Sequence, residues 1–244
     1  MKRAVLKARR SAGADLLLVA LDVDEEAALA HTAAGQYVEV TTRGAASFFV
    51  LASDPRKTPW ELLLRNVGDV AEALSTMPLG SEVDVTMPIG KGFSMTNAGG
   101  RDVVVAVVGT AIAVARPVMR MRIAAGDTKK TALYIGARTL SDVPLVDELD
   151  AWSTEGARIV LCLSKGGLDE AANVLPRAKR TRGYVQYELE RAFGEGHIPK
   201  GALVVAAGPP PMLEAVRAIG EGNEGKTGRS MHDVLPLLEV VTNV

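Results

Sequence analysis

The chain has 244 residues, of which 48% are hydrophobic and 23% are charged, and its formal net charge is −1. This length allows one large domain or two small ones with real cores. The near-neutral balance excludes the excess of positive charge by which many proteins bind nucleic acids or anionic membranes. The single cysteine, Cys162, excludes a disulfide framework and an all-cysteine iron–sulfur cluster supplied by this chain alone. The three histidines are widely spaced, so we expect no metal site.

The amino-terminal segment Met1–Lys7 lacks the apolar core of a signal peptide. The longest apolar run lies within Asp102–Ala115, where it is too short to span a membrane and is interrupted by Gly109. We therefore expect a cytoplasmic protein without a membrane span.

The first hundred residues consist mainly of short β-branched or apolar runs separated by turn-forming residues. One helical stretch interrupts them at Val70–Met77, with its apolar residues on one face. Many short strands with a single helix indicate an antiparallel barrel. The predicted strands are Leu16–Leu21, Gln36–Thr41, Phe48–Ala52, Glu61–Asn66 and Glu82–Met87.

The pattern changes after the glycine-rich stretch Asn97–Gly100, which predicts a boundary between a domain over residues 1–98 and another over 101–244. Beyond it, apolar strands alternate with helical segments, as in a parallel sheet with helices on both faces. The predicted strands are Val103–Val108, Thr131–Ile135, Arg158–Leu163 and Ala202–Ala206, with an edge strand in Leu235–Val241, and the predicted helices are Ile112–Ala125, Ser141–Thr154, Tyr184–Ala192 and Pro211–Ile219.

In an open parallel sheet, ligands bind beyond the carboxyl ends of the strands, so the residues there are candidates for a site. The first strand ends in Gly109-Thr110, where a glycine turn before a helix amino terminus suits a phosphate group. An ordinary tight turn explains this short motif equally well. The fourth strand ends in Gly208–Met212, where the prolines fix the turn and Gly208 leaves room for a planar ring.

Polar residues follow the second and third predicted strands. Arg138 follows the second and Ser164-Lys165 ends the third, where they could hold a phosphate or ribose or could simply be solvated strand ends. The basic segment Arg177–Arg182 comes just before Tyr184. This pattern could bind a phosphate and stack an adenine, or it could be a solvated loop.

Several further motifs stand in the same order as in a known family. They are Gly35–Val38 in an early barrel strand, Phe48–Pro55 in the flavin strand, Glu61–Gly68 before the helix at the flavin diphosphate, and Pro88–Phe93 in the turn that closes the barrel. With the two glycine motifs of the second half, nearly the whole chain resembles the ferredoxin–NADP reductase superfamily. It resembles in particular the electron-transfer subunits of dihydroorotate dehydrogenase and the gamma subunits of sulfhydrogenases, without the segment that holds their iron–sulfur cluster.

The resemblance implies an FAD-binding antiparallel six-stranded β barrel followed by a Rossmann-like NAD(P)-binding α/β domain. It implies an FAD-dependent NAD(P)H reductase whose flavin does the chemistry, with no catalytic side chain. A partner protein, a sister subunit or a small acceptor would take the electrons. On the flavin side, the implied contacts are Phe49, Val50, Leu51, Ser53, Arg65, Gly68, Gly90, Gly92 and Phe93. On the nucleotide side, they are Gly109, Thr110, Gly136, Arg138, Ser164, Arg180, Arg182, Tyr184, Gly208, Pro209 and Met212.

The sequence departs from the family pattern at several positions. Ser47 and Val50 replace the arginine and serine of the flavin strand, and Asp69 places a negative charge where a diphosphate would lie. Ala111 replaces the second glycine of the nucleotide turn, and Ala207 replaces a frequent cysteine. These changes leave open a second interpretation, in which the chain is a non-catalytic relative that senses a nucleotide or serves as a scaffolding subunit.

The basic residues near the adenosine end favour NADPH over NADH, since an adenosine 2′-phosphate needs cations. The serine Ser164, the arginines Arg180 and Arg182, and Tyr184 follow the order seen in NADP-specific relatives. Against this, many of the relatives that the chain resembles use NADH.

Overall fold

The computed structural model describes residues 1–93, 95–96, 98–220 and 234–236. The chain forms two compact units. The first contains the amino-terminal residues through 93 together with Ala113–Arg120, and the second contains the remaining described residues.

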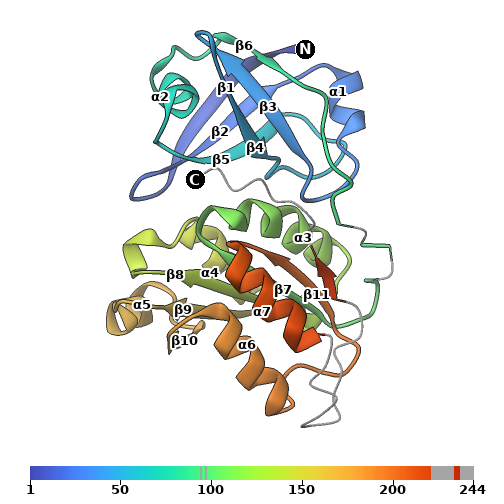
Figure 1. The fold of residues 1–244 in the computed structure, drawn as a ribbon, viewed down its shortest axis with the longest axis vertical. Coiled ribbons are helices and arrows are strands. Elements are labelled where there is room, and N and C mark those ends of the chain that lie inside the picture. Colours follow the sequence, from blue (N-terminus) through green and yellow to red (C-terminus); the bar gives the residue numbers. More distant parts are fainter. Residues whose placement is uncertain (94, 97, 221–233, 237–244) are drawn as a thin grey trace. The chain divides into compact units, whose positions relative to one another are not determined.

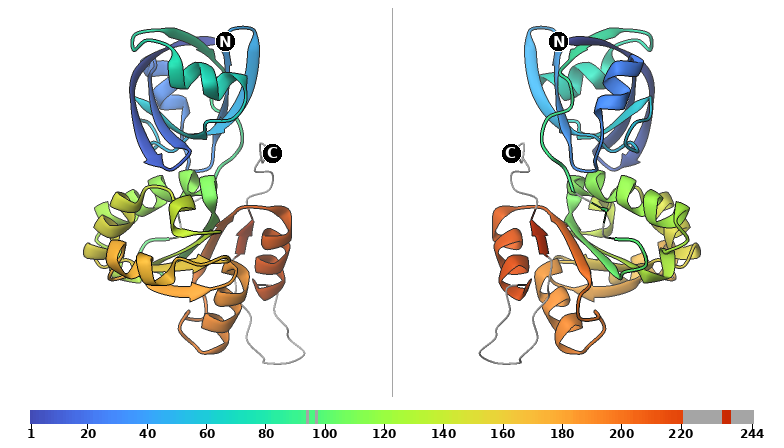
Figure 2. Two further views of the ribbon diagram at one scale, coloured as in Figure 1. Left: turned by 90° about the vertical axis from the view of Figure 1, so that its left-hand side faces the viewer. Right: turned by 90° about the vertical axis from the view of Figure 1, so that its right-hand side faces the viewer.

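The first unit is a six-stranded antiparallel sheet in the order β4-β3-β6-β1-β2-β5 (Figure 1). Its strands curl around a shared interior, as the two views in Figure 2 show. The outer strands β4 and β5 form no continuous ladder in the described residues and are joined by an isolated bridge between Leu51 and Leu62, so the barrel is not fully closed. The elements are β1 Lys2–Gly13, β2 Leu16–Asp22, α1 Glu25–Ala30, β3 Tyr37–Thr42, β4 Ala45–Val50, β5 Trp60–Arg65, α2 Asp69–Thr76 and β6 Glu82–Val85.

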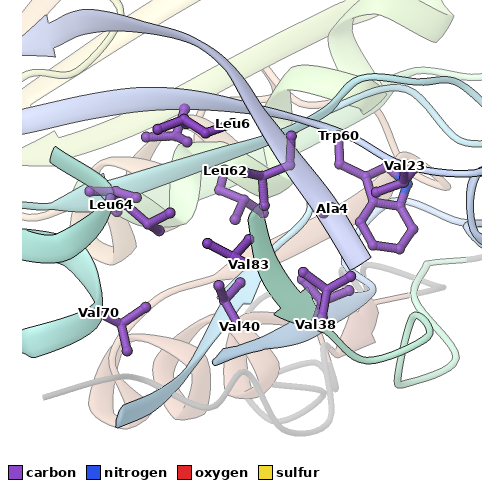
Figure 3. Packing of buried hydrophobic residues seen from close by; sticks show 14 of the residues in the cluster. Ala4, Leu6, Val23, Val38, Val40, Trp60, Leu62, Leu64, Val70 and Val83 are labelled. Carbon is purple, nitrogen blue, oxygen red and sulfur yellow. The ribbon is translucent and has the colours of Figure 1, made fainter. Parts of the chain in front are cut away.

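Alternation along the strands builds the core of this unit, because successive side chains of a strand point to opposite faces. Trp60, Leu62 and Leu64 of β5 all point into the core, as Figure 3 shows. The sequence did not predict β1 or α1. The lysines and arginines of β1 obscure its alternating pattern, although its residues Ala4 and Leu6 are fully buried.

The second unit is a parallel sheet in the order β10-β9-β8-β7-β11-β12, so the first and fifth strands of the unit are neighbours. The strands are β7 Val103–Val108, β8 Thr131–Ala137, β9 Arg158–Leu163, β10 Lys179–Arg182, β11 Leu203–Ala207 and β12 Val234–Pro236. The helices are η1 Gly109–Ala111, α3 Ile112–Ala124, η2 Thr128–Lys130, η3 Leu140–Asp142, α4 Val146–Thr154, α5 Leu168–Val174, α6 Val185–Gly194 and α7 Pro210–Gly220.

Helices cover both faces of this sheet, which explains why its strands are continuous apolar runs (Figure 1). Alternate residues of β7, β8, β9 and β11 pack with α6 and α7 in one core cluster, and the residues between them are buried on the opposite side. The sequence did not predict α5, and it treated Lys179–Arg182 as a basic loop, whereas the segment is the edge strand β10. The predicted edge strand Leu235–Val241 is strand β12 at Val234–Pro236, and its later residues lie outside the described part of the chain.

Candidate cofactor-binding sites

The two glycine motifs of the second unit end neighbouring strands. Val107 of β7 pairs with Ala207 of β11, so Gly109 and Gly208 both follow at the same edge of the sheet. The strand order reverses between β7 and β11, and the crevice at such a switch point is where open α/β sheets bind ligands. The structure therefore brings together the two motifs that the sequence singled out separately.

The Gly109 turn is shaped for the close approach of a ligand. Gly109 has a φ of +56°, and no atom lies within 4 Å of the place where its side chain would begin. The chain continues through η1 directly into α3, whose amino terminus favours negative charge. Ala111 has ordinary helical angles of −62° and −9°, so replacing the family's second glycine costs no backbone strain there.

The Gly208 motif is more restricted than the sequence suggested. Pro209 is exposed at the sheet edge, but Met212 is buried among α6 and the central strands. A side chain at Gly208 would come within 2.7 Å of the Met212 sulfur. The predicted ring contact from Met212 is therefore not available to a ligand, because α7 turns that side chain into the core together with Val216.

At the ends of β8, β9 and β10, several predicted residues gather. Ser164 donates its N–H to the carbonyl of Ala137, and Lys165 donates its N–H to the carbonyl of Arg138 at 2.7 Å. Arg182 pairs with Leu163, the residue before Ser164. Arg138, Ser164 and Arg182 thus lie at one edge of the sheet.

The basic residues there do not have equivalent roles. Arg182 is exposed, and its side chain has no ion pair or hydrogen bond recorded among the described residues. Arg180 instead donates to the carbonyls of Leu175 and Ala178, at 3.1 and 3.0 Å, and so ties the end of α5 to β10. Lys179 pairs with the buried Glu188 at 2.8 Å. Of these three cations, Arg182 is the one whose side chain is not already engaged by the protein, so we expect the phosphate contact from Arg182 more than from Arg180.

Two further nucleotide-side predictions differ in outcome. Tyr184 is 57% exposed and precedes α6, where its ring forms a T-shaped pair with Tyr187. Gly136 is buried, and a side chain there would come within 2.8 Å of Val185 and 3.1 Å of Val108. Gly136 therefore allows α6 to pack against the sheet and leaves no open space for a ribose.

In the first unit, β4 presents its residues alternately to the core and away from it. Phe49 lies opposite the core residue Val38 and packs on the core cluster while staying half-buried. Leu51 is fully buried and offers no side-chain surface to a ring. Val50 lies on the opposite face, where Phe48 and Tyr37 form an edge-to-face pair 5.8 Å apart. The sequence analysis missed this pair, although the two-residue period of a strand places Phe48 and Phe49 on opposite faces.

The start of α2 has features of an anion site and one feature against it. Gly68 has a φ of +91° with no atom within 4 Å of its side-chain position, and no side chain caps the helix. Arg65, at the end of β5, is half-buried and lines a hollow of about 470 Å³ with Asn66 and Val67. Asp69, however, is exposed in the first turn of α2.

The turn that closes the barrel is packed tightly against its neighbours. A side chain at Gly92 would come within 2.6 Å of the Ala34 carbonyl, and a side chain at Gly90 would come within 3.2 Å of the Tyr37 ring. Phe93 is buried, and its N–H donates to the Ala34 carbonyl at 2.7 Å. These three predicted contacts therefore shape the turn, and the Phe93 ring offers no surface to a ligand.

Ser53, the remaining flavin-side candidate, is buried just beyond β4, and its hydroxyl has no hydrogen-bond partner in the described part of the chain. Both ring nitrogens of the nearby buried His31 are also without partners among those residues. Burial lowers the pKa of His31 to about 4 and outweighs the opposing effects of the Ala33 backbone and of Asp54.

Comparison with known proteins assigns the second unit. Residues 107–218 match the family described as "Oxidoreductase NAD-binding domain". The structure matches a ferredoxin NADP+ reductase from Neisseria gonorrhoeae with bound FAD and NADP, with a TM-score of 0.66, 16% identity and 88% of each chain covered. Residues 107–218 thus resemble an oxidoreductase NAD-binding domain, and the structure shares the fold of this ferredoxin NADP+ reductase.

Two curated proteins are also similar to this chain in sequence. The fruit protein pKIWI502 of Actinidia deliciosa is 26% identical over 76% of this chain and 61% of its own length. The gamma subunit of sulfhydrogenase 2 of Pyrococcus furiosus is 30% identical over 47% of this chain and 40% of its own length. The chain thus spans less than two thirds of the length of these curated relatives.

The described residues contain neither a candidate metal-binding group nor a candidate membrane-spanning helix. No group of three or more histidine, cysteine or acidic side chains is placed to hold a metal ion there. No helix in those ranges is long and apolar enough to cross a membrane.

Proposed function

We propose that the chain is a flavin-dependent NAD(P)H reductase that binds FAD on the first unit and NADPH on the second. Electrons would leave the flavin for a partner protein, a sister subunit or a small acceptor. The observation that carries the proposal is the placement of Gly109 and Gly208 together at the switch point of a sheet that matches an oxidoreductase NAD-binding domain. The reductase of Neisseria gonorrhoeae with this fold holds both FAD and NADP.

The residues of the second unit fit a dinucleotide. The open Gly109 turn and the N–H groups at the start of η1 and α3 would hold the diphosphate. Gly208 and Pro209 would border the nicotinamide, and Tyr184 would cover the adenine. Arg138, Ser164 and Arg182 would surround an adenosine 2′-phosphate, which is the reason that we favour NADPH.

The residues of the first unit fit a flavin dinucleotide with fewer charged contacts than the family pattern provides. Arg65 and the uncapped start of α2 near Gly68 would face the diphosphate. Val50 would border the ring with its side chain, whereas Phe49, whose side chain packs on the core, would border it through its backbone. Each missing charged hydrogen bond costs about 1.5–3 kcal/mol, so Ser47 in place of arginine weakens binding without abolishing it. When bound, a flavin accepts a hydride from a nicotinamide and passes electrons onward. The side chains named here bind and orient, and none of them transfers a proton.

The test is the absorbance of the purified chain after addition of FAD. We expect a yellow complex whose visible band bleaches when NADPH is added without oxygen. Mass spectrometry of the released cofactor should give FAD, and recovery of FMN alone would contradict the choice of flavin.

Ala111 offers a sharper test of the nucleotide turn, because it is half-buried at the start of the helix. Ala111→Glu places a negative charge beside the proposed diphosphate, and Ala111→Gln has nearly the same shape without the charge. We expect the glutamate variant to bind NADPH at least tenfold more weakly than the glutamine variant. Equal affinity in the two variants would place the diphosphate elsewhere.

The departures at Ser47, Val50 and Asp69 favour one alternative, a non-catalytic relative that keeps nucleotide binding. Such a chain would remain colourless after addition of FAD, yet its thermal unfolding temperature would still rise with NADPH. The absorbance and the unfolding temperature together separate the two functions.

A further inference from the structure

The barrel of the first unit has one weak seam. Its outer strands β4 and β5 share the Leu51–Leu62 bridge and a hydrogen bond from the Ala52 N–H to the Glu61 carbonyl at 2.7 Å. The sheet order places no other strand between them. Phe49 and Val50, the proposed neighbours of the flavin ring, lie on β4 just before this seam.

Arg116 of α3 reaches both sides of the seam. The segment Ala113–Arg120 belongs to the first unit, and the Arg116 side chain is only 1% exposed. Its Nη1 donates to the carbonyl oxygen of Ala52 at 3.1 Å and lies 3.2 Å from Oε2 of Glu61. Its Nη2 donates to Oε1 of Glu61 at 3.3 Å. A single guanidinium thus contacts the residues that follow β4 and those within β5.

Arg120, one turn later on α3, extends this contact. Its Nη1 lies 3.1 Å from Oε2 of Glu61 and 3.7 Å from Oδ1 of Asp54. Asp54 follows β4 and Glu61 belongs to β5, so the second arginine also spans the seam. A buried guanidinium is tolerated only when it is paired and hydrogen-bonded, and Glu61 supplies that pairing to both arginines.

We infer that Arg116 and Arg120 are positioning residues for the flavin strand: they hold the carboxyl end of β4 against β5 and so fix the placement of Phe49 and Val50. The planar fork of arginine suits this role, because one side chain serves a carbonyl and a carboxylate at once. The inference rests on the proposed flavin site, and neither arginine touches the ring. It assigns to α3 a role in the first unit that is separate from the nucleotide turn at its start.

The experiment titrates FAD into the full chain and into Arg116→Ala, Arg116→Lys and Arg120→Ala. We expect the FAD dissociation constant to rise about tenfold or more in Arg116→Ala and about threefold in Arg120→Ala, the range by which residues outside a site alter binding. Arg116→Lys keeps the charge but not the fork, so it should restore only part of the affinity. The visible circular dichroism of bound FAD should change in shape as the ring environment changes.

Arg122 provides a matched control on the same helix. It is 3% exposed, but it donates to Thr131 and to the carbonyls of Ala98 and Arg101, so it serves the second unit. Arg122→Ala should lower the thermal stability of the second unit and leave the affinity for FAD unchanged. If Arg116→Ala does not fold, Arg120→Ala still tests the inference. The Arg120 side chain is 34% exposed, so its removal should disturb the core less.

The outcomes separate the two proposals. Folded Arg116 and Arg120 variants that bind FAD with wild-type affinity and an unchanged dichroism spectrum would overturn the positioning role while leaving the flavin site intact. An equal loss of affinity in Arg122→Ala would also overturn it, because the effect would then be one of general stability. A wild-type chain that takes up no FAD would overturn the proposed function and this inference with it.

Discussion

The Gly109 turn of the second unit and the Gly92 turn of the first hold their glycines in different ways. At Gly109, the backbone faces open space at the end of β7. In the first unit, Gly92 and Phe93 are packed against the loop at Ala34. A glycine in a family motif can therefore mark either a place for a ligand or a place where two backbone segments touch, and only the surroundings distinguish the two.

The largest expected effect tests this contrast within the first unit. Gly92→Val should destabilise the unit by about 3 kcal/mol or more, because the side chain would overlap backbone atoms in a left-handed conformation. Gly44→Val is the matched control, since its φ is +80° but nothing lies within 4 Å. Urea unfolding should show a clearly smaller loss for Gly44→Val. Equal losses would mean that backbone conformation, and not packing, makes Gly92 necessary.

The buried His31 gives the first unit a pH dependence that the second should lack. Its pKa is near 4 in the folded chain and near 6.5 in the unfolded chain, so the unfolded state binds the proton more readily. This contribution to stability is complete above pH 6.5 and is lost as the pH falls towards 4, by up to ~3 kcal/mol.

His31→Leu should flatten the stability profile between pH 7 and 5, measured by urea unfolding of the first unit. Ordinary carboxylates titrate mostly below this window, so they contribute little to the difference. A wild-type profile that is already flat there would contradict a neutral, buried His31.

Arg180 and Arg182 of β10 allow a structural contact to be compared with a proposed ligand contact in the second unit. Arg182→Ala should lower the catalytic efficiency with NADPH by about tenfold, since a charged phosphate contact contributes about 1.5–3 kcal/mol, and should leave the efficiency with NADH nearly unchanged. Arg180→Ala removes bonds to the Leu175 and Ala178 carbonyls and should reduce stability without changing the NADPH preference. A wild-type chain with no preference for NADPH, or an opposite result for the two arginines, would show that the adenosine phosphate site is wrongly placed.

The smallest expected effect concerns Cys162, in the core of the second unit. Burial raises the pKa of its thiol to about 12, so almost none of it is thiolate at neutral pH. We expect no reaction with a thiol reagent in the folded chain and complete reaction in denaturant, with no change of activity in Cys162→Ala. Rapid modification of the folded chain would show that this core opens readily.

Much of the fold could be predicted from the sequence, because long apolar strands and their helices carry strong periodic signals. The strands that were missed, β1 and β10, are rich in lysine and arginine, and the pattern alone could not show that Ala4 and Leu6 are buried beneath those cations. The two-unit architecture follows from the order of the elements, whereas the pairing of β7 with β11, which creates the switch point, depends on topology that no local pattern contains.

The candidate sites could be predicted only in part. Sequence order indicated Gly109, Gly208 and Tyr184 as candidates, and these stay predictions, but it could not show that Met212 turns inward or that Gly136 accommodates Val185. The contacts of Arg116 with Ala52 and Glu61 join residues far apart in the chain, so no motif could have indicated them. Side-chain direction and long-range partners are properties of the folded chain.

The neighbouring positions of β7 and β11 also affect how the chain can fold during synthesis. Val103 pairs with Leu203, and every strand and helix between them must be translated before that pairing is possible. In the first unit, by contrast, β1 and β2 are adjacent in sequence and can pair as a hairpin early. Pairings between distant residues slow folding, because a long loop must close first. On the ribosome, β7 therefore emerges with an apolar strand edge that stays unpaired until β11 arrives, and such an exposed edge favours aggregation.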